Sequence, residues 1–184
     1  MLKYLIPGCG FGGSCFPKDV QAIRSLGRDH GLAMNIMSAV LETNEKQPHQ
    51  VIKILEAETG SLINKKVLIL GLAFKPGTDD VRESSAIQII FDFLKSGAKV
   101  YAHDPIAVEN FLEMYDDKVS NDIFIQDWRA IIKEVDHIII VTAWEEYLEL
   151  NKINLTGKII FDTRRLLDST SMNPKKYLSI GRNI

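Results

Sequence analysis

The hydrophobic positions divide the chain into two unlike parts, which meet near residue 62. In the first part, apolar residues recur at helical spacing after an opening loop. In the second part, short apolar runs alternate with amphipathic stretches. We therefore expect a loop with helices over residues 1–62 and an α/β domain over residues 63–184.

The first part opens with residues 1–17, which are too rich in glycine and proline to form a regular element. Helical periodicity runs from Lys18 to about Arg28 and is interrupted at Gly31. A second helical stretch covers Ala33–Glu58. Because proline disrupts a helix interior, Pro48 predicts either a kinked helix or two helices.

In the second part, short continuous apolar runs predict buried strands, and amphipathic stretches predict helices. The predicted strands are Lys66–Gly71, Lys99–His103, His137–Thr142, Lys158–Asp162 and a short Tyr177–Ile180. The predicted helices are Ala86–Lys95, Ala107–Met114 and Trp128–Glu134. This alternation predicts an α/β fold with a doubly wound parallel sheet.

Ligands of such sheets bind beyond the carboxyl ends of the strands, near the switch point. The candidate site segments are therefore Gly71–Arg82, Asp104, Thr142–Trp144 and Asp162–Arg165.

Composition excludes several classes of partner. The 22 basic and 24 acidic residues are well mixed and give a net charge of -2, so nucleic acid and anionic membranes are not expected partners. The longest apolar stretch, His137–Ala143, is too short to cross a bilayer, and no signal peptide opens the chain, so we expect a cytoplasmic protein. The two cysteines and four histidines have no metal-binding spacing.

The opening loop contains glycines that permit close approaches which a side chain would block. They are Gly8, Gly10, Gly12 and Gly13. We expect a ligand or another backbone segment to pass against them. Ser14 is a candidate cap for the next helix, with Pro17 in its first turn.

Cys15 would lie at the start of that helix, where the helix dipole and Lys18 favour the thiolate. Asp19, one helical turn further, could position water or move protons during the breakdown of a thiol adduct. These neighbours predict a catalytic nucleophile, although a single cysteine is more often a small buried hydrophobe. Cys9 lacks such neighbours, and we expect it to be structural.

The segment from Gly71 to Ser85 follows the first predicted strand, where α/β proteins often hold phosphates. A standard Gly-x-Gly-x-x-Gly dinucleotide grip is not expected, because Ala73 and Pro76 stand where glycines are needed. Its cations, Lys75 and Arg82, suit an anionic ligand, unless the segment is an ordinary solvated loop.

Two strand ends carry further candidates. Asp104 either binds a ribose, as the acid of a Rossmann domain does, or forms an Asp-Pro turn. Arg164 and Arg165 either face a ligand or are a solvated pair.

Two motifs carry a family resemblance. The run Gly8-x-Gly10-Phe-Gly-Gly-Ser-Cys-Phe-Pro-Lys-Asp19 resembles the active-site motif of the UDP-glucose/GDP-mannose dehydrogenase family. The run Leu70-Gly-Leu-Ala-Phe-Lys-Pro-Gly-Thr-Asp-Asp-Val-Arg-Glu-Ser84 is similar to the opening of that family's C-terminal nucleotide-binding domain. Matches in the same order are Asp104-Pro105, Thr142-Ala-Trp144, Asp162-Thr-Arg164 and Ile180-Gly-Arg182.

The resemblance implies a Rossmann-like domain that binds a nucleotide sugar, preceded by an active-site loop and central dimerisation helices. The family's N-terminal NAD-binding domain, with a catalytic lysine and asparagine after it, has no counterpart in this sequence. We therefore expect the chain to correspond to the latter half of such an enzyme and to be inactive alone.

In the intact enzyme, the resemblance implies that NAD oxidises the sugar C6 alcohol to an aldehyde, which the cysteine captures as a thiohemiacetal. A second oxidation gives a thioester, which water hydrolyses to the uronate. Cys15 matches the nucleophile, Asp19 the assisting carboxylate, and Arg82 a residue that reaches NAD. The residues that match substrate contacts are Tyr4, Leu5, Phe11, Gly12, Gly13, Phe16, Lys75 and Arg164. Asn44 matches a recurrent family position to which we assign no role.

The Ser-Cys-Phe-Pro-Lys-Asp form resembles the UDP-glucose and GDP-mannose branches, and Thr142-Ala-Trp144 favours UDP-glucose. The resemblance also implies a homodimer through Ala33–Glu58, unless this stretch packs on its own domain. Two alternatives stay open. The chain is either a nucleotide-sugar-binding or dimerisation module that works with a separate NAD-binding domain, or a remnant without activity.

Overall fold

A computed structural model describes residues 6–181 of the chain. Two long helices come first, α1 (Phe16–Asp29) and α2 (Asn35–Thr59). The strands that follow are β1 (Lys66–Leu70), β2 (Lys99–His103), β3 (His137–Ile140), β4 (Ile159–Asp162) and β5 (Lys176–Leu178). Between them lie α3 (Ser85–Lys95), α4 (Val108–Tyr115), α5 (Trp128–Ile131) and the 3-10 helices η2 (Asn121–Ile123) and η3 (Glu145–Lys152). Within this described part, no helix is both long and apolar enough to cross a membrane.

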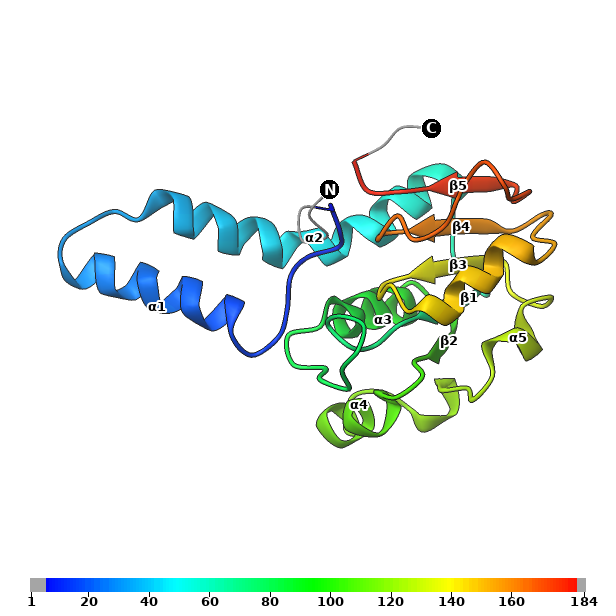
Figure 1. The fold of residues 1–184 in the computed structure, drawn as a ribbon, viewed down its shortest axis with the longest axis horizontal. Coiled ribbons are helices and arrows are strands. Elements are labelled where there is room, and N and C mark those ends of the chain that lie inside the picture. The colour runs from blue at the N-terminus through cyan, green and yellow to red at the C-terminus, as the bar shows by residue number, and fades with distance from the viewer. Residues whose placement is uncertain (1–5, 182–184) are drawn as a thin grey trace.

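The strands form one parallel sheet in the order β2-β1-β3-β4-β5 (Figure 1). Because β1 pairs with both β2 and β3, the sheet grows first in one direction and then in the other. The boundary between β1 and β3 is therefore the switch point, at which ligands of such sheets bind. The predicted doubly wound α/β fold is confirmed.

Successive residues of β1 point to opposite faces of the sheet, and each face has its own core. Val67 and Ile69 pack with buried residues of α2 and α3, whereas Leu68 and Leu70 pack with Trp128 of α5. Burial on both faces explains why the strands appear in the sequence as continuous apolar runs.

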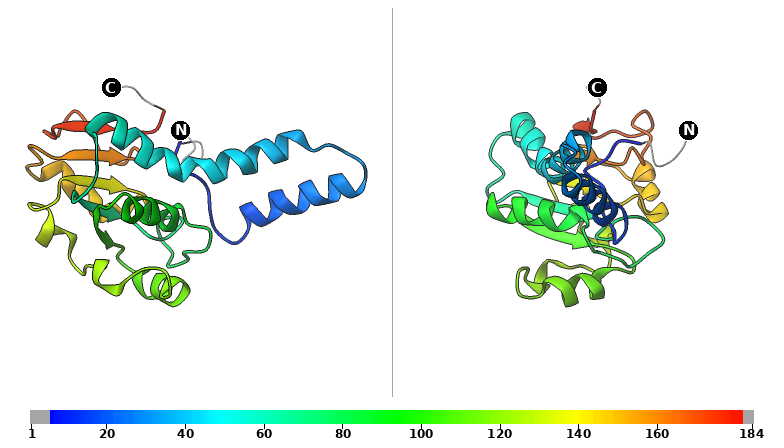
Figure 2. Two further views of the ribbon diagram at one scale, coloured as in Figure 1. Left: turned by 180° about the vertical axis from the view of Figure 1, so that it is seen from behind. Right: turned by 90° about the vertical axis from the view of Figure 1, so that its left-hand side faces the viewer.

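The helices α1 and α2 form a hairpin that projects beyond the carboxyl edge of the sheet (Figures 1 and 2). We call the projecting part, residues 16–47, the arm. The helix α2 runs unbroken through Pro48, so the two-helix alternative is excluded. Its second half returns over the sheet, where Val51 and Leu55 are fully buried. There the His49 Nδ1 atom lies 2.7 Å from a carboxylate oxygen of Asp92 on α3.

The helix α5 is shorter than predicted, because it ends at Ile131 and not at Glu134. The backbone tightens there into a turn in which the Glu134 N–H donates to the Ile131 carbonyl at 2.9 Å. The ammonium of Lys158 then donates to two carbonyls of the same turn, at 2.9 and 2.8 Å. These long-range bonds satisfy carbonyls at the end of the turn, where no further helical N–H groups follow to pair with them.

Candidate functional site

The opening loop crosses the carboxyl end of the sheet between α2 and the segment that joins β1 to α3. On one side, the Gly13 N–H donates to the Arg82 carbonyl at 2.9 Å. On the other side, the side chain of Asn44 makes two hydrogen bonds with the backbone of Phe11, at 2.7 and 3.0 Å. The loop is thus attached both to the arm and to the α/β domain.

Gly12 and Gly13 lie where a side chain has no room. A Cβ atom on Gly12 would stand 2.1 Å from the carbonyl oxygen of Glu83, and one on Gly13 would stand 2.7 Å from the ring of Phe74. Gly13 also has a φ of 87°, which favours glycine. The expectation that another backbone segment passes against these glycines is therefore confirmed.

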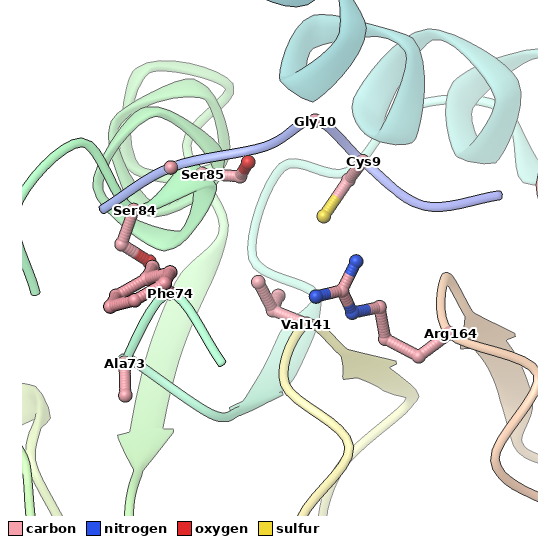
Figure 3. A pocket seen from close by; sticks show the side chains of 9 residues that line it. Cys9, Gly10, Ala73, Phe74, Ser84, Ser85, Val141 and Arg164 are labelled. Carbon is pink, nitrogen blue, oxygen red and sulfur yellow. The ribbon is translucent and has the colours of Figure 1, made fainter. Parts of the chain in front are cut away.

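A narrow pocket of about 10 Å³, enough for about one water molecule, lies between the loop and the switch point and is partly open to solvent (Figure 3). Its walls come from the loop, from the β1–α3 segment, and from the ends of β3 and β4. The lining residues are Cys9, Gly10, Gly12, Ala73, Phe74, Ser84, Ser85, Val141 and Arg164. Arg164 extends its guanidinium toward the loop, and a Cβ atom on Gly8 would lie 2.3 Å from its Nη1 atom. A cation therefore lines this pocket, together with Phe74 and several small side chains.

The two cysteines lie in different environments. Cys9 is buried, with 1% of its surface exposed, and accepts a hydrogen bond from the Thr163 hydroxyl at 3.4 Å. Cys15 is exposed and precedes the first residue of α1. One thiol therefore lies in the interior, and the other is exposed to solvent.

Ser14 does not cap α1, contrary to the expectation from sequence. Cys15 occupies the N-cap position with a helical backbone conformation, and no side chain caps the helix. Ser14 therefore lies one residue too early, and its hydroxyl oxygen instead lies 3.6 Å from the Cys15 sulfur.

Asp19 lies one turn along α1 from Cys15, and its N–H donates to the Cys15 carbonyl at 2.8 Å. Its carboxylate is exposed and forms an ion pair with Lys18 at 3.7 Å. Phe16 is 58% exposed, and its ring packs edge-on against that of Phe11 with centroids 4.6 Å apart. Phe16 and Asp19 are three positions apart and therefore lie on the same face of α1.

The cations of the β1–α3 segment differ in how they are held. Lys75 is exposed and lies over the Phe74 ring, 5.1 Å from its centroid. Arg82 is bound by both carboxylate oxygens of Asp80, at 2.9 and 2.7 Å. This hydrogen bonding raises the pKa of Arg82, and the nearby Cys15 sulfur raises it further. Arg82 is thus a permanently charged, oriented group beside the cysteine loop.

Asp104 is buried, and both of its oxygens are occupied by donors of its own chain. One oxygen accepts from the Leu72 and Ala73 N–H groups at 2.8 and 3.1 Å, and from the Trp144 indole at 2.9 Å. The other accepts from the N–H groups of residues 106 and 107 at 3.1 and 2.9 Å. Of the two sequence interpretations, the structure favours the turn-forming Asp-Pro over a ribose-binding acid.

Polar side chains at the ends of β3 and β4 are likewise hydrogen-bonded within the chain. The Thr142 hydroxyl donates to the Ala73 carbonyl at 2.5 Å, and Asp162 accepts from the Leu167 N–H and the Tyr177 hydroxyl at 2.8 and 2.9 Å. Burial raises the pKa of Asp162 above its usual range. These polar groups at the strand ends shape the edge of the site instead of facing a ligand.

The structure brings most of the predicted site residues to one edge of the molecule. Tyr4 and Leu5 lie outside the described residues. The sequence selected the segment Gly71–Ser85 as a whole but did not single out Phe74, Ser84 and Ser85 as pocket walls, because only the packing of the loop shows which side chains face the cavity. Among residues 6–181, no group of three or more His, Cys, Asp and Glu side chains is arranged to hold a metal ion.

Comparison with known families agrees with this geometry. Residues 68–169 match the UDP-binding domain of the UDP-glucose/GDP-mannose dehydrogenase family, and residues 1–46 match the central domain of the same family. The UDP-glucose 6-dehydrogenase of Rickettsia conorii is 38% identical over 99% of this chain, which spans 43% of that protein. The UDP-glucose 6-dehydrogenase TuaD of Bacillus subtilis is 37% identical over 98% of this chain, which spans 40% of that protein. The chain therefore spans less than half the length of these relatives.

Solved structures show the same fold. A UDP-glucose dehydrogenase from Pyrobaculum islandicum superimposes with a TM-score of 0.80 at 40% identity, over 93% of this chain and 38% of its own. A GDP-mannose dehydrogenase from Pseudomonas aeruginosa has a TM-score of 0.79 at 24% identity, over 96% of this chain and 41% of its own. At that identity, the second comparison supports the fold alone.

Proposed function

The chain belongs to the UDP-glucose/GDP-mannose dehydrogenase family, and from this we propose that it carries the nucleotide-sugar site and the reacting cysteine of an NAD-dependent 6-dehydrogenase that converts UDP-glucose to UDP-glucuronate. The observation that carries the proposal is the narrow pocket at the switch point, which is lined by Arg164 and by the loop that leads to Cys15. GDP-mannose is the alternative substrate.

Recognition of the substrate would combine cations for the diphosphate with lining residues from the opening loop. Arg164 and Lys75 would pair with the diphosphate, since cations suit phosphate oxygens. By resemblance to the family, Phe11, Gly12 and Gly13 would line the site from the loop. By resemblance to the family, Tyr4, Leu5 and Phe16 would complete the lining.

The chemistry of this chain would lie at the start of α1. Cys15, exposed and next to the positive end of the helix, would add as a thiolate to the aldehyde carbon of the sugar. This bond retains the aldehyde as a thiohemiacetal until it is oxidised to a thioester. Asp19, one turn away, would take a proton from the water that hydrolyses the thioester and so releases the carboxylate and the thiol.

Within residues 6–181, the family resemblance assigns one residue to a contact with NAD. The segment after β1 lacks the glycines of a dinucleotide grip, and both oxygens of Asp104 are already used. Arg82 is the residue that would touch the cofactor, because it is exposed, charged and oriented by Asp80. When bound, NAD would supply the hydride acceptor. We therefore propose that the main NAD site belongs to a separate domain.

Calorimetric titration with UDP tests the nucleotide site. We expect UDP to bind more tightly than GDP, and Arg164→Ala to weaken binding at least tenfold. Arg165→Ala is the matched control, because Arg165 is an adjacent arginine whose guanidinium donates to the Ile180 carbonyl at 3.0 Å. No UDP binding at millimolar concentration would refute the proposed site. Stronger binding of GDP would instead favour the mannose branch.

Turnover is tested separately. The chain mixed with NAD and UDP-glucose should produce no NADH, whereas adding an NAD-binding domain of the family expressed as a separate chain should restore it. Steady NADH production by the chain alone would contradict the proposal that the main NAD site belongs to a separate domain. A restored activity that survives Cys15→Ser would contradict the role of the cysteine.

The arm supports a homodimer as a second part of the proposal. Large apolar side chains are exposed along it, with relative exposures of 51% for Ile23, 61% for Leu26, 60% for Leu32 and 75% for Ile36. Such a surface on a soluble protein usually meets a partner, and a second copy is the partner that the family resemblance implies. Sedimentation velocity should show a dimer that Leu26→Glu with Ile36→Glu converts to monomer. A monomeric wild-type chain would refute this part.

A further inference from the structure

We propose that Asn44 is a positioning residue that fixes the cysteine loop against α2. The inference rests on the proposed function, since it assigns to the loop the delivery of Cys15 to the substrate. It adds a role for a residue on the arm, outside both the pocket and the reacting groups.

The first observation is the pair of hydrogen bonds between Asn44 and Phe11. The Phe11 N–H donates to the Asn44 Oδ1 atom at 2.7 Å, and the Asn44 Nδ2 atom donates to the Phe11 carbonyl at 3.0 Å. The side-chain amide thus pairs with both backbone groups of one residue, as a neighbouring strand does in a hydrogen-bonded antiparallel pair. Only asparagine or glutamine offers a donor and an acceptor in this arrangement, and glutamine is one methylene longer.

The second observation concerns the backbone around Asn44. Pro48 lies four residues later and has no N–H, so the Asn44 carbonyl has no partner within the helix from that position. Gly10 passes at this point. A Cβ atom placed on it would lie 3.1 Å from Asn44 Oδ1 and 3.6 Å from the Asn44 carbonyl oxygen. One turn along the same face of α2, the Gln47 amide donates to the Gly8 carbonyl at 3.3 Å. The helix therefore holds the loop at residues 8 and 11.

The third observation is how near this attachment lies to Cys15. Gly12 separates Phe11 from Gly13, and Gly13 is in turn bonded to the Arg82 carbonyl. The loop is therefore fixed on both sides within three residues, and Cys15 follows two residues later. If the Asn44 pair is removed, the bond between Gln47 and Gly8 still joins the loop to α2, but it lies seven residues before Cys15. Between Gly8 and Cys15, the loop then keeps its attachment to the α/β domain at Gly13 and loses the one to α2 at Phe11.

Two variants and a control test this role. Asn44→Ala removes both bonds. Asn44→Asp keeps an acceptor for the Phe11 N–H but sets a carboxylate oxygen against the Phe11 carbonyl. Glu45→Ala is the matched control, because it changes an exposed neighbour on the same helix. Far-UV circular dichroism melts of each variant show whether α2 and the sheet stay folded.

The measurement is amide hydrogen exchange of Phe11 and Gly13 by NMR, together with the rate of Cys15 alkylation by iodoacetamide and the affinity for UDP. In Asn44→Ala, exchange at both amides should accelerate about tenfold or more, as the loss of a typical hydrogen bond predicts. The alkylation rate should change, and UDP should bind about tenfold more weakly. In Asn44→Asp, Phe11 should stay protected while Gly13 accelerates. The control should resemble the wild type.

Exchange at Gly13 and alkylation of Cys15 within twofold of the wild type in Asn44→Ala would overturn the proposal, since Asn44 would then bond Phe11 without positioning the loop. A wild-type chain that binds no UDP would count against the proposed function only. The exchange and alkylation results still decide the role of Asn44 in that case, because they require no ligand.

Discussion

Replacing Asp104 by asparagine tests whether the edge of the site is built on this buried carboxylate. The carboxylate accepts five N–H groups: two from residues 72–73, two from residues 106–107, and the indole of Trp144. An amide of the same shape has one acceptor oxygen, so at best it retains the three bonds of one carboxylate oxygen. Its NH2 group then faces the two N–H donors of residues 106–107.

The expected cost follows from these two lost bonds. A hydrogen bond to a charged acceptor contributes about 1.5–3 kcal/mol, so Asp104→Asn should lower the free energy of unfolding by roughly 3–6 kcal/mol. Water can reach part of this turn, and we therefore expect the lower end, about 3 kcal/mol. For a chain of this size, that corresponds to a fall in Tm of roughly 6–12 °C.

The assay is urea unfolding at pH 7, followed by far-UV circular dichroism. Asp117→Asn is the control, because it makes the same chemical change at an exposed position and should shift stability by less than about 0.5 kcal/mol. If Asp104→Asn unfolds with the same midpoint as the control, the carboxylate does not hold the strand ends together. The alternative role as a ligand-binding acid would then regain support.

Three further predictions concern buried histidines and close-packed glycines. Among the described residues, His137 is buried with no hydrogen-bond partner for either ring nitrogen, so His137→Leu should raise the free energy of unfolding by about 1–3 kcal/mol in urea melts. Burial lowers the pKa of His137 and His103, so below about pH 6.5 the unfolded state binds more protons than the folded state. The free energy of unfolding should therefore fall as the pH drops, and it should fall less steeply in His137→Leu. A profile that is flat between pH 5 and 7 would contradict this reasoning. Gly12→Ala should lower the free energy of unfolding by about 1–3 kcal/mol, because the new Cβ atom would lie 2.1 Å from the Glu83 carbonyl oxygen. In Gly31→Ala the Cβ atom would have no neighbour within 4 Å, so the loss should be about 1 kcal/mol and come from the φ of 74°. Equal thermal shifts of these two variants would show that the loop can move aside.

The sequence predicted the sheet well because its strands are buried on both faces, which makes each one a continuous apolar run. It could not decide the effect of Pro48, since whether a helix continues through proline depends on contacts such as those of the buried Val51. The two interpretations of Asp104 likewise depended on partners more than 30 positions away, including Leu72 and Trp144.

The candidate site likewise has some features that the sequence predicts and others that it does not. Cys15 and its neighbours on α1 were predictable, because helix spacing and the glycine-rich loop are local signals. The attachment of Phe11 to Asn44 spans 33 positions and leaves no periodic trace. Ser14 was assigned as a cap because its residue type is common there, but the helix start is set by how the loop enters it.

The unbroken course of α2 has a mechanical consequence. Its second half is fixed to the domain through the buried side chains of Val51 and Leu55, while its first half projects with the arm. A tilt of α2 about the edge of the domain therefore displaces the first half. Asn44 lies seven positions before Val51, about 10 Å along the axis, so a tilt of about 5° would carry it by about 1 Å. Displacements of that size are enough to change the rate of a positioned reaction about 100-fold. If a second copy packs against the arm, as proposed above, the tilt of α2 in that contact would also set the position of the cysteine loop.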